Sequence, residues 1–282
     1  MIDETVEEIR EMQTHSSSVV AVKATRALSE LLDREFATLE EYERDLERNA
    51  GALRRANPSH ASLYNAMREV TESVVDETDT VDEAKARTRE TIERVVEDVE
   101  RGKRRAAETA AETFEDGETF LTHDYSSTVL EAVEIAVRDG IELTAYATEA
   151  RPRYLGRKTA RTLASMDRVD THLIVDSASG YVLEECDRVI IGMDCIVDDV
   201  LYNRIGTFPI VAAANEVGVP VTIVGSGAKI IEDGFRFENE FRSPAEVMLE
   251  PAEGFSIDNP AYDATPVSLI DEVITDEQTR HY

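Results

Sequence analysis

The first part of the chain repeats its apolar residues at helical spacing and shows almost no strand pattern. Four stripes recur every three or four residues, as on one face of a helix. They comprise Val6, Ile9 and Met12; Val20, Ala24, Ala27, Leu28 and Leu31; Leu63, Ala66, Met67 and Val70; and Ile92, Val95, Val96 and Val99. The pattern predicts an antiparallel helical domain of four or five helices over residues 1–115.

From Glu118 onward, short β-branched runs alternate with amphipathic segments. The candidate strands are Thr119–Thr122, Glu142–Ala147, Thr171–Val175, Arg188–Ile191 and Val219–Val224. Helical segments are expected near 127–139, 155–165, 178–185 and 205–217, the last ending at Gly218. Such alternation is typical of a parallel sheet covered by helices. The sequence therefore predicts an α/β protein whose Rossmann-like parallel-sheet domain spans residues 116–282.

Polar side chains gather where these strands end, and right-handed crossovers would bring all those ends to one side of the sheet. Three loops and the segment after Asp198, taken as a charged loop, supply the candidate ligand-binding groups. These are His123, Asp124, Ser126, Ser127, Arg151, Arg153, Asp194, Asn203 and Arg204. Arginines facing hydroxyls and helix N-termini suit a phosphate or a sugar phosphate. The plain alternative is an ordinary crossover with a solvated acidic loop.

The charge of the chain indicates the salt concentration of its surroundings. Its 59 acidic and 30 basic residues give a net charge of -29, while 42% of the residues are hydrophobic, enough for a core. Strong self-repulsion that salt would screen favours a protein of a salt-rich cytoplasm. An acidic interaction protein is the competing interpretation. Direct binding to a nucleic-acid backbone is not expected at this charge.

The remaining composition adds further expectations. Cys186 and Cys195 are too few for a disulfide framework and lack metal-ligand spacing, so we expect no metal and no cofactor. Without an apolar run of about 18 residues, no membrane span is expected, and the acidic N-terminus does not resemble a signal peptide. The predicted location is the cytoplasm.

Several motifs together resemble one family over nearly the whole chain. They are Thr122-His123, Arg151-Pro152-Arg153 with Gly156, Asp176-Ser177-Ala178, Gly192-x-Asp194, Asn203-Arg204-Ile205-Gly206-Thr207 and Asn259-Pro260-Ala261-Tyr262-Asp263. The chain resembles the translation initiation factor 2B α/β/δ-subunit family, which also contains methylthioribose-1-phosphate and ribose-1,5-bisphosphate isomerases. The resemblance implies a helical N-terminal domain and a Rossmann-like domain that forms a homodimer, with the segment Phe255–Ile270 near the interface.

For the isomerases of that family, the resemblance implies an acid–base pair made of a Cys and an Asp. Asp194 stands at the position of the Asp, and Asn203 and Arg204 replace an Asn-Lys pair that helps to hold the substrate. Asp124 stands where the Cys is expected. An Arg-Gly-Ala phosphate clamp would fall at His15-Ser16-Ser17, and an Arg-Pro-Thr segment at Asn57-Pro58-Ser59. An acid–base group and two arginines would then be missing.

Each remaining candidate has a structural interpretation beside the functional one. Asp124 and Asp194 could share acid–base work as two carboxylates, but we favour Asp124 as a cap of the helix that starts near Ser126. His123 could donate to a phosphate or satisfy only backbone groups. Cys195 is more typical of a core thiol. Gly225-Ser226-Gly227 could wrap a phosphate, although a plain turn is favoured.

The positions at which the chain departs from the isomerase motifs decide the function that we expect. They favour an initiation-factor-2B-like protein that binds a sugar phosphate or nucleotide as a regulatory ligand, without isomerase activity and with a possible protein partner in translation. The alternative is an aldose–ketose isomerase of the ribose-1,5-bisphosphate type with Asp124 and Asp194 as an altered acid–base pair.

Overall fold

The computed structural model describes residues 2–11, 17–231, 235–250 and 253–282. Its contacts divide the chain into two compact units, Met1–Gly102 and Lys103–Tyr282. The division falls inside one long helix, α5 (Val81–Ala111), whose last residues pack with the second unit. The predicted fold class, a helical part followed by an α/β part with a mostly parallel sheet, is confirmed. The expected domain boundary at residue 115 stays a prediction.

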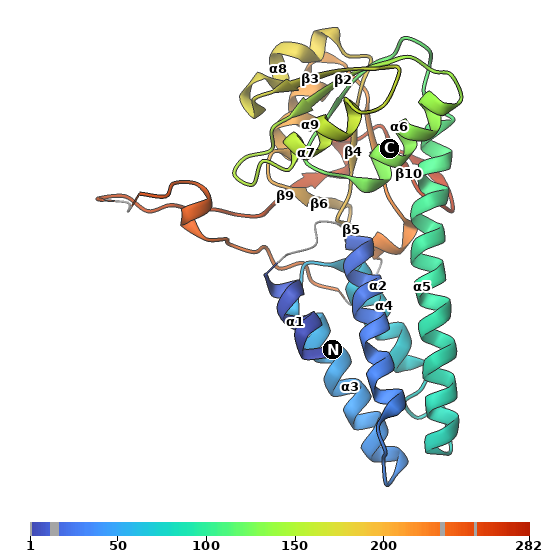
Figure 1. Cartoon of the computed structure of the whole chain (residues 1–282). Coiled ribbons are helices and arrows are strands. Elements are labelled where there is room, and N and C mark those ends of the chain that lie inside the picture. The colour runs from blue at the N-terminus through green and yellow to red at the C-terminus, as the bar shows by residue number, and fades with distance from the viewer. Residues whose placement is uncertain (1, 12–16, 232–234, 251–252) are drawn as a thin grey trace. The chain divides into compact units, whose positions relative to one another are not determined.

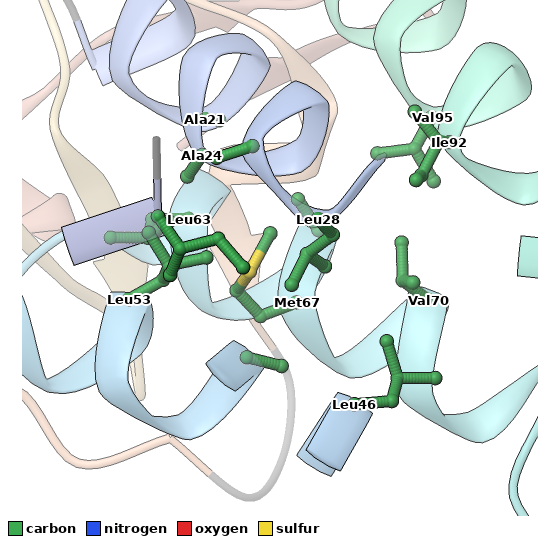
Figure 2. Packing of buried hydrophobic residues seen from close by; sticks show 14 of the residues in the cluster. Ala21, Ala24, Leu28, Leu46, Leu53, Leu63, Met67, Val70, Ile92 and Val95 are labelled. Atoms are coloured by element: carbon green, nitrogen blue, oxygen red, sulfur yellow. The ribbon is translucent and has the colours of Figure 1, made fainter. Parts of the chain in front are cut away.

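The first unit is helical. Its helices are α1 (Ile2–Arg10), α2 (Ser17–Ala27), α3 (Leu39–Ala56), α4 (Ala61–Glu72) and the first part of α5. Figure 2 shows how Leu28, Leu53, Leu63 and Met67 meet between them. The residues of the four predicted stripes form this core, apart from Met12, which lies outside the described residues. Their burial follows from the helical spacing, which puts each stripe on one face.

The second unit is built on a large sheet, sheet A, in the order β11-β10-β7-β4-β1-β2-β3. Its strands are β1 (Thr119–Thr122), β2 (Leu143–Thr148), β3 (Val169–Ile174), β4 (Arg188–Gly192), β7 (Val221–Val224), β10 (Glu272–Ile274) and β11 (Thr279–His281). All pair in parallel except β10 with β11. All five predicted strands are present, shifted by at most two residues at either end.

Along the chain, helices connect the strands of sheet A, and Figure 1 shows them beside the sheet. They are α6 (Ser127–Arg138), α7 (Gly156–Leu163), the short α8 (Ser179–Val182) and α9 (Thr207–Val217). Alternate residues of one strand enter different cores: Leu121 packs in one and Phe120 in the other. The central strands are therefore covered on both faces, which explains why β4 and β7 read as nearly continuous apolar runs.

A smaller sheet, sheet B, was not expected. It has the order β8-β5-β6-β9 and consists of β5 (Cys195–Val197), β6 (Val200–Arg204), β8 (Ile230–Ile231) and β9 (Tyr262–Pro266). Residues 198–203 were predicted as a charged loop, and this prediction is wrong. Asp198 and Asp199 take positive φ angles of 49° and 59° and form the two-residue turn of a hairpin between β5 and β6.

Candidate functional site

Two carboxylates and one guanidinium group meet at the carboxyl ends of β1, β4 and β6. Asp124 follows β1, Asp194 follows β4, and Arg204 ends β6. Arg204 Nε lies 3.3 Å from Asp194 Oδ2 and 3.7 Å from Asp124 Oδ2, and at most 14% of each side chain is exposed. Arg204 thus neutralises part of the charge of two carboxylates that would otherwise repel each other.

The hairpin of sheet B and strand β9 position Arg204. Its guanidinium carbon lies 4.8 Å from the ring centroid of Tyr262, the first residue of β9, which pairs with Arg204 across the sheet. Burial alone would lower the pKa of Arg204, but Tyr262, Asp194 and Asp124 raise it above its ordinary value. The group therefore stays charged beside the two carboxylates.

Lys229 supports the backbone beside Asp194 and was not predicted from the sequence. Its side chain is buried, and Nζ donates to the carbonyl of Met193 over 2.7 Å, directly before Asp194. Burial lowers the pKa of Lys229, while the nearby charge of Asp194 opposes the shift. A lysine just after the last apolar strand of the βα pattern was the signal that could have indicated it.

The turn that presents Lys229 is held by the end of sheet A. Gly227 N donates to Asp276 Oδ1 over 2.7 Å, and the Ser226 hydroxyl accepts from Ala228 N over 3.3 Å. Gly225-Ser226-Gly227 therefore leads into the short 3-10 helix η4 (Gly227–Lys229), in which a serine caps the turn. This local bonding agrees with the turn that the sequence favoured.

His123 supports the site through contacts of its two ring nitrogens. Its Nε2 lies 2.8 Å from the carbonyl of Ile205 and its Nδ1 lies 2.6 Å from the Thr148 hydroxyl. Because a carbonyl can only accept, Nε2 carries a proton. Gly206 has a φ of +105°, and a Cβ there would come within 2.7 Å of the imidazole ring. With both ring nitrogens engaged, His123 anchors the loop after β6.

Asn203 has a similar supporting position. Its Nδ2 donates over 3.0 Å to the Thr207 hydroxyl, which itself donates to the carbonyl of Arg204 over 2.6 Å. Asp263 Oδ2 accepts from Gly206 N and Phe208 N at the start of α9. The motif around Asn203 therefore fixes the backbone on both sides of Arg204.

The helix after β1 is capped by Ser126, so the interpretation of Asp124 as its cap is wrong. Ser126 Oγ accepts from Val129 N over 3.3 Å. Asp124 has a φ of 60°, and its carboxylate faces Arg204 instead. Ser127, the first residue of α6, lines a different hollow, together with Lys103 and Glu131. Ser126 and Ser127 thus belong to the helix start, while Asp124 belongs to the pocket.

The loop after β2 brings arginines to the pocket. Asp176, just after β3, accepts from Ala150 N and Arg151 N, both over 2.8 Å, and so fixes this loop. Arg153 is half-buried, and burial lowers its pKa, an effect that neighbouring Arg242 adds to. Arg151 Nη2 donates to the carbonyl of Val247 over 3.2 Å.

A narrow pocket lies beside these groups, with about 340 Å³ of empty space including its mouth. Its lining residues come from five places in the sequence. They are Asp124, Ala150, Arg151, Pro152, Arg153, Leu155, Arg204, Ile205, Arg242, Asn259, Pro260 and Ala261. Arg242 was not predicted from the sequence, because no periodic element or quoted motif contains it. Asp124 and Arg204 line the pocket, and Asp194 lies behind them, paired with Arg204. A pocket lined by four arginines and one carboxylate can hold an anionic ligand beside an acid–base group.

Other candidate groups lie elsewhere. Cys186 and Cys195 are buried, burial raises the pKa of both thiols, and neither lines this pocket. Residues 12–16, with most of the expected phosphate clamp, lie outside the described residues, while Asn57 and Ser59 are buried in the helical unit. Within the described ranges, no three His, Cys, Asp or Glu side chains could hold a metal ion. No described helix is both long and apolar enough to span a membrane.

The α/β unit thus places an arginine-lined pocket beside the carboxyl ends of its strands. The family model of the initiation factor 2 subunit family matches residues 13–277. The chain belongs to this family, as its motifs indicated.

Named relatives extend the comparison. A ribose 1,5-bisphosphate isomerase of Haloterrigena turkmenica is 32% identical over 96% of this chain and 88% of its own length. A crystal structure of 5-methylthioribose 1-phosphate isomerase from Pyrococcus horikoshii has a TM-score of 0.81 and 26% identity, covering 99% of this chain and 84% of that one. The translation initiation factor eIF-2B of the same organism has a TM-score of 0.82 and 25% identity, covering 99% and 96%.

Proposed function

We propose that this protein isomerises a phosphorylated ribose from aldose to ketose, in the manner of a ribose-1,5-bisphosphate isomerase. This is the alternative that the sequence analysis placed second. The observation that carries it is the pairing of Asp124 and Asp194 with the same guanidinium group, that of Arg204, beside an arginine-lined pocket that Asp124 and Arg204 themselves line. The similarity to the named isomerases supports it further.

The reaction needs proton transfers that two carboxyl groups can perform. Opening the sugar ring requires a proton on the ring oxygen as its bond to the anomeric carbon breaks. A proton is then removed from the second carbon and one is returned to the first, while the hydroxyl of the second carbon loses its proton to become the ketone. One carboxyl group acts as acid and the other as base, within reach of the same sugar. Asp124 takes the place of the cysteine in this scheme.

The supporting residues have defined tasks in the proposal. Arg204 holds both carboxylates and faces the pocket, where it also attracts a phosphate. Lys229 fixes the backbone beside Asp194 through the Met193 carbonyl. His123 and Asn203 keep the loop after β6 in place.

The test is a turnover assay with ribose-1,5-bisphosphate and methylthioribose-1-phosphate in molar KCl, in which formation of the ketose product is measured. We expect Asp194→Asn and Asp124→Asn each to abolish turnover while changing ligand affinity little. Asp199→Asn is the matched control, because Asp199 is exposed at the hairpin turn and asparagine tolerates its positive φ. Wild-type protein that binds a sugar phosphate without converting it would contradict the proposal.

A regulatory role is the second candidate, and the identity of residue 124 favours it. The isomerase acid–base cysteine expected from the resemblance is an aspartate here, and the similarity to eIF-2B is as strong as that to the isomerase structure. In this case the pocket binds a sugar phosphate or nucleotide, and Asp194→Asn alters only affinity. Titration calorimetry with ribose phosphates and nucleoside monophosphates, run beside the turnover assay, separates the two roles.

A further inference from the structure

Arg242 reaches the pocket from the segment between β8 and β9, whose described residues form no strand and only one short 3-10 helix. Figure 1 shows these described residues in orange, projecting from the sheets. Its base is fixed beside the pocket, because Arg242 N donates to the Asn259 carbonyl and Ala261 N donates to the Glu240 carbonyl, both over 2.8 Å. Only 11% of the Arg242 side chain is exposed. The position of this guanidinium group is therefore built into the fold.

Glu246 links Arg242 to Arg153, which lines the pocket from the loop after β2. Arg242 Nε donates to both carboxylate oxygens of Glu246, over 3.2 and 3.1 Å. The Glu246 carboxylate also lies 3.9 Å from Arg153 Nε and accepts from Asn259 Nδ2 over 3.3 Å. One carboxylate thus orients two arginines that come from segments about 90 residues apart.

Four arginines line this pocket: Arg151, Arg153, Arg204 and Arg242. Arg153 and Arg242 share Glu246, and the more exposed Glu240 lies 3.7 Å from Arg242. Burial lowers the pKa of Arg153, the nearby charges of Arg242 and Arg204 lower it further, and Glu246 and Asp124 oppose the shift. Such a cluster is stabilised by an anion that accepts from several guanidinium groups at once.

We propose that Arg242 and Arg153 together bind one phosphate group of the substrate, with Glu246 as the positioning residue of both. The assignment rests on the proposed function, since it names a phosphate subsite of the same pocket.

Titration calorimetry at one fixed KCl concentration tests this with ribose 1-phosphate, ribose 5-phosphate and ribose 1,5-bisphosphate. We expect Arg242→Gln to weaken binding of the bisphosphate by about ten- to a hundredfold, as for a lost hydrogen bond to a charged group. The same variant should weaken only the monophosphate whose phosphate enters this subsite. Arg138→Gln, which removes an exposed arginine of α6 paired with Glu134, should leave all three affinities unchanged.

Glu246→Gln is the second variant. As a positioning change it should weaken the same monophosphate as Arg242→Gln and spare the other, whereas a general loss of structure would weaken both. Where Arg242→Gln does not fold by circular dichroism, Arg242→Lys keeps the charge and should show a smaller loss with the same selectivity. Unchanged affinities, or equal losses for both monophosphates, would overturn the assignment.

The outcome is independent of turnover. Selective loss of binding in a protein that converts no sugar would leave the phosphate subsite standing and remove the isomerase. Normal turnover with an unchanged KM in Arg242→Gln would leave the isomerase standing and remove the phosphate subsite.

Discussion

Lys229 is buried against the backbone that carries Asp194, so its exchange tests how far this acid–base group depends on its support. Lys229→Met keeps a long side chain but removes the donor to the Met193 carbonyl. We expect kcat for the phosphorylated ribose to fall more than KM rises, because the change acts on the orientation of Asp194 and not on the arginines. Steady-state kinetics measure this, with the exposed Lys158→Met as control. An unchanged kcat would contradict the supporting role.

The same residue predicts a pH effect on stability. The pKa of Lys229 is lowered in the folded state from its ordinary 10.5, so the folded protein releases this proton at a lower pH than the unfolded chain. The contribution of Lys229 to the free energy of unfolding is therefore largest above that ordinary value and falls as pH falls through the lowered pKa. Denaturation of wild type and Lys229→Met between neutral and alkaline pH should show their difference changing in this direction.

At the scale of elements, a buried ion pair joins the residue before β1 to the start of β4. Arg188 Nε lies 2.5 Å from Glu118 Oε1, both side chains are less than a tenth exposed, and the guanidinium group also packs on Phe114. Arg188→Met leaves Glu118 buried without its partner, and we expect it to lower the free energy of unfolding by about 3–5 kcal/mol.

A double replacement separates the charge from the packing. Arg188→Met combined with Glu118→Gln removes both charges, and we expect it to recover a large part of the loss. Urea denaturation of the wild type and the three variants, including Glu118→Gln alone, closes the cycle. Additive losses would show that the two side chains act separately.

The whole molecule carries a net charge of -29, and its folding should depend on salt. The Debye length grows from about 3 Å at 1 M to about 30 Å at 0.01 M, so repulsion among the acidic residues spreads as salt is withdrawn. We expect the melting temperature measured by circular dichroism to rise steadily with KCl. The same melting temperature in dilute buffer and in molar KCl would refute the expectation of a salt-adapted protein.

The apolar side chains of the projecting segment predict a homodimer. Phe241, Leu249 and Phe255 are 67%, 86% and 58% exposed. Of the segment Phe255–Ile270, first expected near the interface, Phe255 is thus exposed, but Tyr262 and Ile270 are buried within this chain. Exposed apolar residues in one segment are typical of a contact surface. Light scattering should give about twice the 31.4 kDa chain mass, and Leu249→Asp should lower it while the equally exposed Tyr181→Asp does not. A wild-type mass of one chain would contradict this.

Local patterns were enough to predict much of this protein from its sequence. The helical stripes, the five core strands and the stop at Gly218 follow from spacings of two to four residues, which depend only on the geometry of a helix or strand. The motifs of Asp194 and Arg204, placed after strands, also indicated a polar site at one edge of the sheet. A resemblance spread over the whole chain then identified the family.

The tertiary structure decided what touches what inside that site. Sheet B was missed because the two aspartates of its hairpin turn also suit a solvated loop, and β9, the second partner of β6, lies some 60 residues further along. Arg242 lines the pocket, while Glu246 and Lys229 contact Arg153 and the Met193 carbonyl, partners about 90 and 36 positions away for which no local period exists. Asp124 shows the same limit: a carboxylate before a helix suits a cap by its sequence, and only the tertiary structure pairs it with Arg204, the guanidinium group that also pairs with Asp194.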